Sequence, residues 1–372
     1  METMALPQAT RERVLSLDIL RGFDMFFIMG GDALMAALAA ALGYADSVFA
    51  RQFGHVAWAG LSFEDTIFPL FLFIAGATFP LSLAKQRANG ASRSAIARRI
   101  LRRGLTLVLL GLIYNGLLTF DFAHLRYYGV LQLIGVAWMA AALLRLFTSG
   151  RTRVLVAAAL LIGTPLLFFF VGAGDFPNAA PFTAEGNLGC WIDRTLIGVA
   201  HLHRPLYDPE GAASILSSIV TAILGTFAGD LLESPRPATR KTAMLGGAAA
   251  LLLAAGLILS PIVPLVKNIW TSSFVLVTGG YSTAMLALFY YVFDVQKIRL
   301  GATFFRVIGL NAITIYLAQE IVGFQHMTVF LFGGLATLLP DIWGRVVFHL
   351  GYVAICWLFL AVLYRKNIFL KV

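Results

Sequence analysis

The sequence predicts an all-α protein, a polytopic membrane bundle of about ten transmembrane helices with both termini in the cytoplasm. Hydrophobic residues make up 59% of the 372 residues, charged residues only 13%, and the mean hydropathy is +0.83. Such a chain is too apolar for a soluble protein of this length. Ten apolar segments are long enough to span a bilayer. Basic residues are concentrated in every second one of the segments that connect them. Segments of this length satisfy their backbone hydrogen bonds as helices.

Each predicted span holds roughly 18 to 26 predominantly apolar residues. The spans are 17–42, 63–85, 101–120, 129–147, 154–171, 213–232, 242–259, 270–293, 304–324 and 344–363. We expect residues 1–372 to form one transmembrane domain, with the first span kept as a signal anchor. The loop 172–211 is rich in turn-forming Pro, Asn, Asp and Gly, and we expect it to cap the outside face.

The distribution of basic residues predicts the orientation. With the N-terminus inside, twenty Lys and Arg residues, including Arg11, Arg13 and Lys371, fall in inside segments and six in outside segments. This bias places both termini in the cytoplasm. The net charge of +9 is therefore mostly a topology signal, which makes the lipid bilayer the expected partner and gives no reason to propose nucleic acid.

The first span carries four charged residues, Asp18, Arg21, Asp24 and Asp32. On a continuous helix they share an arc of about 120°, and Asp32 lies roughly 21 Å beyond Asp18. Such a polar stripe suits a long ligand threaded through the bundle. The first three could equally form a structural ion network. Asp32 has no cation near it in the sequence, which favours a functional role.

His55 places a titratable side chain at a predicted membrane boundary, between the first two spans. An imidazole can exchange a proton near neutral pH, and it can also attack a carbonyl carbon. A plain interfacial role is the alternative. Asp65, at the start of the second span, is placed to orient the ring, and Asp32 approaches a similar depth. These three residues are the predicted catalytic group.

The sequence gives little evidence for a metal site or for a disulfide. The His201-x-His203 pair lacks a third ligand at a diagnostic spacing, so a surface or capping role is favoured over a metal site. Cys190 is predicted outside and Cys356 within the last span, so we expect no disulfide and no C-x-x-C metal site. We therefore predict no metal.

Seven short motifs, in order along almost the whole chain, carry a resemblance to a known family. They are SLDILRGFD from Ser16, HVAWAG from His55 followed by DTIFPLFLFI from Asp65, RYYGVLQ from Arg126, NLGCWIDR from Asn187, YDPEG from Tyr207, KNIWT from Lys267 and GLNAI from Gly309. The sequence thereby resembles the transmembrane acetyltransferase family of the heparan-alpha-glucosaminide N-acetyltransferases, including its bacterial members. One position departs from the family pattern, because Asp32 stands where the family has asparagine. An ionised carboxylate cannot donate a hydrogen bond to a thioester carbonyl as an amide can.

The resemblance implies an acetyl-CoA-dependent N-acetyltransferase that moves acetyl from cytoplasmic acetyl-CoA to the amino group of a glucosamine-type sugar, as in heparan sulfate, on the outer side. His55 would be the general base in direct transfer, or a transient acetyl carrier in a ping-pong path. We favour the base, because one tunnel holding both substrates already supplies proximity. Asp65 or Asp32 would orient the imidazole.

The remaining candidate residues form two groups, one expected to bind the acetyl donor and one expected to bind the acceptor. The donor candidates are Arg21, Arg126, Gln132, Arg102 and Arg103, and the acceptor candidates are Trp58, Asp193, Glu210 and Asn268. Basic residues at the cytoplasmic mouth could bind the nucleotide phosphates, although each could also be only a topology signal. Asp193, Glu210 and Asn268 fall outside and could contact sugar hydroxyls, or they could only shape loops.

Two other functions fit the sequence. The chain could be an amino-sugar transporter that uses intramembrane carboxylates for proton coupling, although it shows no repeat symmetry. It could also O-acetylate an envelope glycan, which keeps the donor and changes the acceptor. The family resemblance further implies a homodimer and a multi-pass location in a bacterial-type inner membrane.

Overall fold

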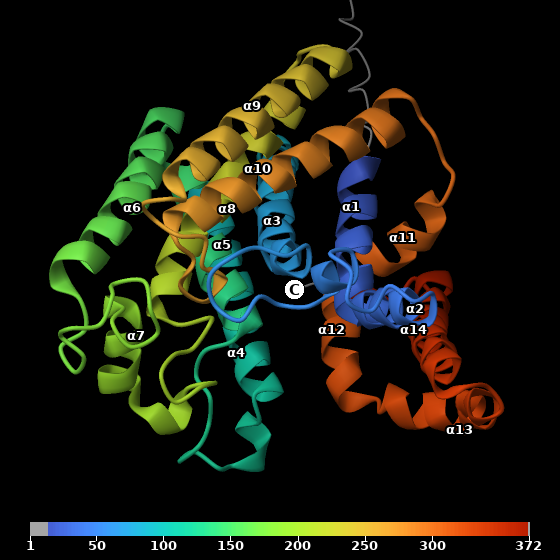
Figure 1. The fold of residues 1–372 in the computed structure, drawn as a ribbon. Helices are drawn as coiled ribbons and strands as arrows, with labels where there is room; N and C mark the ends of the chain where they lie inside the picture. Colours follow the sequence, from blue (N-terminus) through green and yellow to red (C-terminus); the bar gives the residue numbers. More distant parts are fainter. Residues whose placement is uncertain (1–13, 371–372) are drawn as a thin grey trace, which may run out of the picture.

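The computed structural model describes residues 14–370 and confirms the all-α bundle (Figure 1). Arg11, Arg13 and Lys371, which entered the charge count, lie outside the described residues. The α-helices are α1 Leu15–Phe26, α2 Asp32–Ala41, α3 Glu64–Ala88, α4 Arg93–Tyr114, α5 Val130–Phe147, α6 Gly150–Val171, α7 Leu188–Ile192, α8 Ala212–Glu233, α9 Ala238–Leu259, α10 Ser272–Phe289, α11 Ala302–Gly309, α12 Ala312–Ile321, α13 Phe324–Thr337 and α14 Asp341–Arg365.

Eight helices within residues 14–370 are long and apolar enough to cross a membrane, and a ninth is added if the bent pair α11 and α12 counts as one span. They differ in how much of their surface the protein covers. In α3, 67% of the residues of the most apolar window are buried, against 17% in α6 and in α9. Helix α3 therefore runs through the centre of the bundle, while α6 and α9 lie at its periphery (Figure 1).

Three of the ten expected spans differ from the prediction. The expected span 101–120 is replaced by α4, Arg93–Tyr114, which begins earlier and carries several arginines, so it is not among the apolar spanning helices. The expected span 304–324 is divided into α11 and α12, whose axes meet at 67°. Leu310 and Asn311 interrupt the helix there. Hydropathy detected the apolar stretch and could not detect the bend.

The first span is also interrupted. A π-helical turn, Phe27–Gly31, separates α1 from α2, and Gly30 within it has a φ of 109°, which only glycine adopts readily. Helix α2 leaves the axis of α1 at this point and packs against α14 (Figure 1). The rotation of 100° per residue used to place the polar stripe therefore holds for α1 and does not extend to Asp32.

The hydrophobic interior consists of several clusters, of which two enclose the candidate site. One is built mainly from α3, α4, α5, α8 and α10, and the other from α1, α11, α12, α13 and α14. Phe71 of α3 and Tyr316 of α12 pack against both clusters. The seam between the clusters is thus lined by α1 and α12 on one side and by α3 and α5 on the other.

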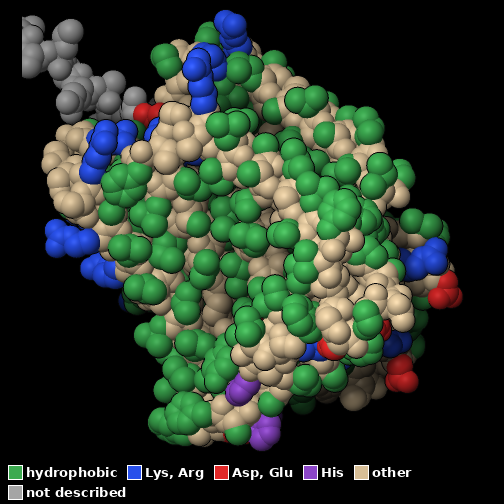
Figure 2. Space-filling model, turned by 90° about the vertical axis from the view of Figure 1, so that its left-hand side faces the viewer, with side chains coloured by type: hydrophobic (Ala, Val, Ile, Leu, Met, Phe, Trp, Pro, Cys, Tyr) green, Lys and Arg blue, Asp and Glu red, His purple; other side chains and the backbone are tan. Residues whose placement is uncertain are grey.

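The outer surface suits a lipid environment. Figure 2 shows a face covered largely by hydrophobic side chains, with Lys and Arg at its upper rim and histidines at its lower rim. Large exposed apolar side chains include Leu155, Phe170, Leu251 and Phe330. Contiguous exposed apolar surface of this extent is typical of a membrane-spanning protein.

Glycines allow α3 and α8 to approach closely. A Cβ atom on Gly76 would lie 2.4 Å from the carbonyl oxygen of Ala222, and one on Gly225 would lie 2.2 Å from that of Phe73. Small residues at helix crossings permit backbone contact inside a membrane bundle. This contact fixes α3, whose first turn carries Asp65.

We predict that Gly225→Ala destabilises the bundle by about 1 to 3 kcal/mol, because the new methyl group meets backbone that cannot rotate away. Thermal unfolding in detergent should show a lower Tm. Gly246→Ala is the matched control, since a Cβ atom there meets nothing within 4 Å. Equal Tm values for the two variants would contradict the close-packing account.

Candidate active site

His55 lies in an irregular segment between a short 3₁₀ turn, Ala50–Phe53, and α3. Contacts with the loop before α10 hold this segment in place. Ala59 forms an antiparallel bridge with Val266, and the N–H of Gly60 donates to the carbonyl of Leu265 at 2.8 Å. These backbone contacts bring Lys267 next to the histidine, although 212 residues separate the two in the chain.

Asp65 is placed by the way α3 begins. The sequence Ser62-Phe-Glu-Asp65 forms a reciprocal cap, in which the N–H of Asp65 donates to Ser62 Oγ at 3.3 Å. Asp65 Oδ2 accepts from the N–H of Ser62 at 3.2 Å and from its hydroxyl at 2.9 Å. A Ser followed three residues later by an acidic residue is a recognised start signal for a helix. The cap locks the Asp65 side chain in one orientation.

The locked carboxylate holds two further side chains. His55 Nδ1 lies 2.9 Å from Asp65 Oδ1, and Lys267 Nζ lies 3.3 Å from the same oxygen. Lys267 Nζ also lies 3.0 Å from His55 Nδ1. The Asp65 side chain is only 2% exposed, whereas the His55 side chain is 58% exposed. In the tautomer whose Nδ1–H donates to the carboxylate, Nε2 is the unprotonated, basic nitrogen, and Lys267 Nζ lies 3.4 Å from it.

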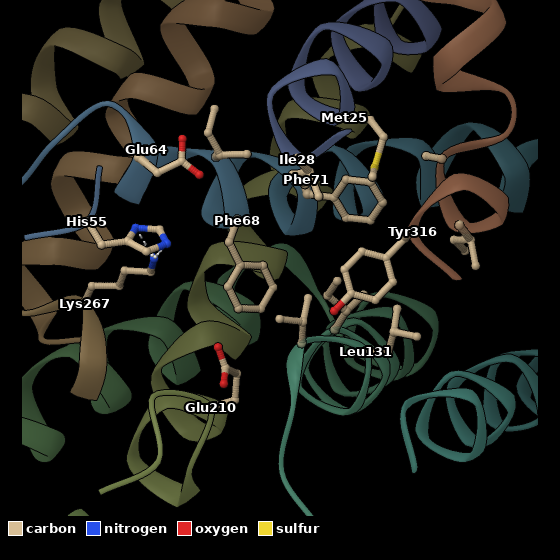
Figure 3. A pocket seen from close by; sticks show the side chains of 15 residues that line it. Met25, Ile28, His55, Glu64, Phe68, Phe71, Leu131, Glu210, Lys267 and Tyr316 are labelled. Carbon is tan, nitrogen blue, oxygen red and sulfur yellow. Dashed lines mark hydrogen bonds between the residues drawn. The ribbon is translucent and has the colours of Figure 1, made fainter. Parts of the chain in front are cut away.

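His55 and Lys267 line a cavity of about 190 Å³ at the seam between the two hydrophobic clusters (Figure 3). Its walls are mostly apolar and come from α1, the π-helical turn, α3, α5 and α12. They are Met25, Ile28, Ile67, Phe68, Phe71, Val130, Leu131, Ile134, Ala312 and Ile313. The polar lining consists of His55, Lys267, Glu64, Glu210 and Tyr316. The cavity therefore offers an apolar chamber with a base and two carboxyl groups at its edge.

Glu210 reaches the cavity from a buried ion cluster in the loop before α8. Arg126 donates from Nε and Nη2 to the Asp208 carboxylate at 2.8 and 2.6 Å, and it also pairs with Glu210. Burial lowers the pKa of the Arg126 guanidinium, but the two carboxylates outweigh it and hold that pKa above its ordinary value. Burial raises the pKa of Glu210, opposed by Arg126.

The loop 172–211 contains a further buried carboxylate besides Asp208 and Glu210. Asp193 is 2% exposed, and its Oδ1 accepts from the hydroxyl of Tyr128 at 2.8 Å and from the N–H of Ala212 at 3.1 Å. Burial raises the pKa of Asp193 to about 6, although the Tyr128 hydrogen bond opposes this shift. Trp58 Nε1 donates to the carbonyl of Phe182 at 2.6 Å, which ties the loop to the histidine segment.

A second cavity, of about 630 Å³, lies where α1, α11 and the end of α14 meet. Three arginines line it, Arg21, Arg306 and Arg365. Nε of Arg306 is buried without a hydrogen-bond partner among the described residues. Arg21 and Met25 are one helical turn apart on α1, and Leu310 and Ala312 flank Asn311, so both cavities border α1 and the junction of α11 and α12, although no residue lines both.

The structure brings together only part of the predicted catalytic and acceptor set. His55 and Asp65 are in direct contact, and Asp32 lies within electrostatic range of His55 and Glu64. Glu210 lines the cavity. Asn268 donates to the carbonyl of Ala57 at 3.4 Å and so supports the histidine segment.

The predicted donor residues are spread over the molecule. Arg21 lines the second cavity, which three arginines border. Arg103 stacks on Trp138, and the positive charge of Arg21 acts on it from nearby. Arg102 is exposed on α4. Arg126 belongs to the buried ion cluster, and Gln132 donates to the carbonyl of Tyr127 at 3.3 Å.

His201 of the histidine pair contacts neighbouring protein groups, and both cysteines are buried. His201 Nδ1 lies 2.8 Å from the carbonyl oxygen of Leu125, and its ring stacks on Tyr127. Within residues 14–370 no group of three His, Cys, Asp or Glu side chains could hold a metal ion. Cys190 and Cys356 are both buried free thiols.

Sequence reasoning missed four lining residues, Glu64, Lys267, Arg306 and Arg365. Arg306 had a usable signal, since an arginine inside an apolar segment is costly unless it faces a polar space. Lys267 stood within a quoted motif, but nothing in its spacing pointed to His55. Its position depends on pairing between two loops, which leaves no periodic pattern in the sequence.

Fold and site define a multi-pass helical membrane protein with a histidine–carboxylate pair at the mouth of an apolar cavity. Residues 13–178, which include His55 and Asp65, match the family model described as heparan-alpha-glucosaminide N-acetyltransferase, catalytic. The chain is 29% identical over 327 residues to the mouse heparan-alpha-glucosaminide N-acetyltransferase and 28% identical over 332 residues to the human one. Each alignment covers 72% of this chain and 49% of the relative, so the chain spans about half the length of the curated relatives it matches. The family resemblance predicted from the motifs is confirmed.

We predict that Asp193→Asn changes how stability depends on pH. The folded state raises the Asp193 pKa from 3.8 to about 6, so its favourable contribution is present below about pH 4 and is lost as the pH rises through 6. The loss amounts to roughly 3 kcal/mol by pH 7.5. Asparagine keeps an oxygen for Tyr128 and Ala212 and cannot ionise. The Tm of the variant relative to the native protein should therefore rise between pH 5 and pH 7.5, and a constant difference would refute this account.

Proposed function

We propose that this protein is a membrane-embedded acetyltransferase that passes an acetyl group from acetyl-CoA, bound on the cytoplasmic side, to an amino group of a glucosamine-type sugar on the outer side. The observation that carries the proposal is the His55–Asp65 hydrogen bond at the edge of an apolar cavity, together with an arginine-lined cavity that borders the same helix, α1. The similarity to heparan-alpha-glucosaminide N-acetyltransferases supports it. The proposal places the protein in a bacterial-type inner membrane.

The arginine cavity suits the phosphates of coenzyme A. Guanidinium groups form charge-assisted, bidentate hydrogen bonds with phosphate oxygens, and the buried Nε of Arg306 lacks a partner among the described residues. The arm that carries the thioester would follow α1 toward the apolar cavity. Both side-chain polar atoms of Asn311 are buried near this route with no partner in residues 14–370, and amide groups of the pantetheine arm would supply partners for them.

The apolar cavity suits the thioester end. At this end His55 presents Nε2, while Asp65 keeps Nδ1 protonated and stabilises the imidazolium that forms when Nε2 accepts a proton. His55 then acts as the general base that deprotonates the attacking amine. Holding donor and acceptor together supplies the proximity that an acetyl-histidine intermediate would otherwise provide.

The acceptor would approach His55 from the exposed side. Glu210 lines the cavity from the loop before α8 (Figure 3), and its carboxylate is paired with Arg126. Trp58 packs edge-on against Tyr207 with ring centroids 4.9 Å apart, which gives an aromatic surface near the site. Asn268 offers an amide beside it. These groups match the hydroxyls and apolar face of an amino sugar.

Two alternatives predict different behaviour. A transporter would carry glucosamine into sealed vesicles without acetyl-CoA. An O-acetyltransferase would modify sugars whose amino group is already blocked. An acceptor panel of glucosamine, N-acetylglucosamine and short glycans therefore distinguishes the acceptor classes, and an uptake assay tests transport.

We predict that the purified protein with acetyl-CoA and glucosamine yields N-acetylglucosamine, measured by mass spectrometry, and that His55→Ala lowers the rate by about 10²- to 10⁴-fold. Asp65→Asn should also lose rate, because the amide cannot hold the ring in the same tautomer or stabilise the imidazolium. His124→Ala is the matched control, since His124 is exposed and pairs only locally with Asp121.

Full activity of His55→Ala would overturn the assigned base while leaving an acetyltransferase. Absence of product from the native protein with every amine in the panel, together with uptake of glucosamine into vesicles, would overturn the acetyltransferase itself.

We predict that Arg306→Gln and Arg365→Gln raise the KM for acetyl-CoA by about 10- to 100-fold each, because each loses charge-assisted hydrogen bonds to phosphate. The kcat should change little, because the reacting atoms lie in the other cavity. Initial rates at varied acetyl-CoA give both constants. Arg240→Gln, an exposed arginine at the start of α9, is the control. A fall in kcat at constant KM would be inconsistent with a phosphate site.

A further inference from the structure

We propose that Glu64 is the acid that protonates the coenzyme A thiolate as it leaves, a role that rests on the proposed acetyl transfer. Cleavage of the thioester C–S bond puts a negative charge on sulfur. In a cavity lined mostly by apolar side chains that charge has little solvation. A proton delivered to sulfur as the bond breaks removes the charge from the leaving group. His55 already has a different task, accepting a proton from the amine.

Most polar groups that line the cavity are committed elsewhere. Lys267 pairs with Asp65, and Glu210 pairs with Arg126. Tyr316 stacks on Tyr114 with ring centroids 4.9 Å apart. Glu64 differs, because its Oε2 is buried and has no hydrogen-bond partner within residues 14–370. Among the lining acids it is therefore the one left to exchange a proton.

The start of α3 gives Glu64 its position. Asp65, the next residue, turns away to hold His55 and the Ser62 cap, while Glu64 points to the cavity (Figure 3). Adjacent residues differ by about 100° around a helix, so one turn can orient the base and present an acid. Ile67, Phe68 and Phe71 continue the same wall of α3 away from Glu64. A thioester lying along this wall would have its sulfur beside the carboxyl group.

The step balances in atoms and electrons. The amine nitrogen, deprotonated to its neutral form, forms a bond to the acetyl carbon, and the C–S electron pair stays on sulfur. Glu64 gives its proton to sulfur, which forms the coenzyme A thiol. His55 takes the proton released from nitrogen as the amide forms. That proton restores Glu64, since the two side chains are electrostatic neighbours, and the proton lost earlier from the ammonium goes to solvent.

The test compares two acetyl donors. With acetyl-CoA, whose alkyl thiolate leaves poorly, Glu64→Gln should lower kcat by at least about 100-fold. With S-(4-nitrophenyl) thioacetate, whose thiolate is stable without a proton, the variant should stay within about threefold of the native protein. Glu320→Gln, at an exposed position outside the cavity, is the matched control. Glu64→Asp and Glu64→Asn form a second pair of equal size, of which only the acid should retain turnover of acetyl-CoA.

Equal losses with both donors would overturn the role of Glu64 as an acid, because a damaged site does not discriminate between leaving groups. Unchanged rates with both donors would overturn it as well. His55→Ala should lose rate with both donors, since the amine needs its base in either reaction. Failure of the native protein to acetylate any amine from acetyl-CoA would instead refute the proposed function.

Discussion

The site depends on the interactions of one group, the carboxylate of Asp65. It accepts hydrogen bonds from Ser62, from the N–H of Val56 at 3.3 Å and from the His55 ring, and it pairs with Lys267. An ionised carboxylate that is 2% exposed needs such partners, because an uncompensated charge in this setting costs several kcal/mol. The two loops that meet here have almost no regular structure of their own. The requirement to satisfy one buried charge therefore gives an irregular region a defined geometry.

The cavity depends on a second feature, a break in each of two helical segments. Helix α1 ends at the π-helical turn that contains Gly30, and α11 gives way to α12 at Asn311. Met25 lines the cavity before the first break and Ile28 within it, and Ala312 and Ile313 line it after the second. Irregular backbone within a membrane is tolerated where it is covered by protein or borders a cavity. The breaks and the cavity thus have a common explanation.

The fold was largely predictable because hydropathy and charge act over whole segments. Spans such as 129–147 and 154–171 match α5 and α6 closely, since nothing within them competes with helix formation. The bend at Asn311 was not predictable, because it depends on which helices pack around it. The same distinction applies to the site. His55 and Asp65 are ten residues apart, and the cap with Ser62 fixes Asp65 locally, so the sequence could pair them, whereas Lys267 reaches them only through tertiary loop pairing.

The size of the cavity bears on which function the site can serve. At about 190 Å³ it is smaller than the roughly 300 to 1,000 Å³ typical of pockets that enclose a whole ligand. A transporter must enclose its sugar at some point between the two sides of the membrane. An acetyltransferase needs only the acetyl thioester to enter the chamber, while the sugar stays on the exposed side of His55, whose side chain is 58% accessible. An apolar chamber with an accessible imidazole at its edge therefore fits group transfer better than passage of a solute.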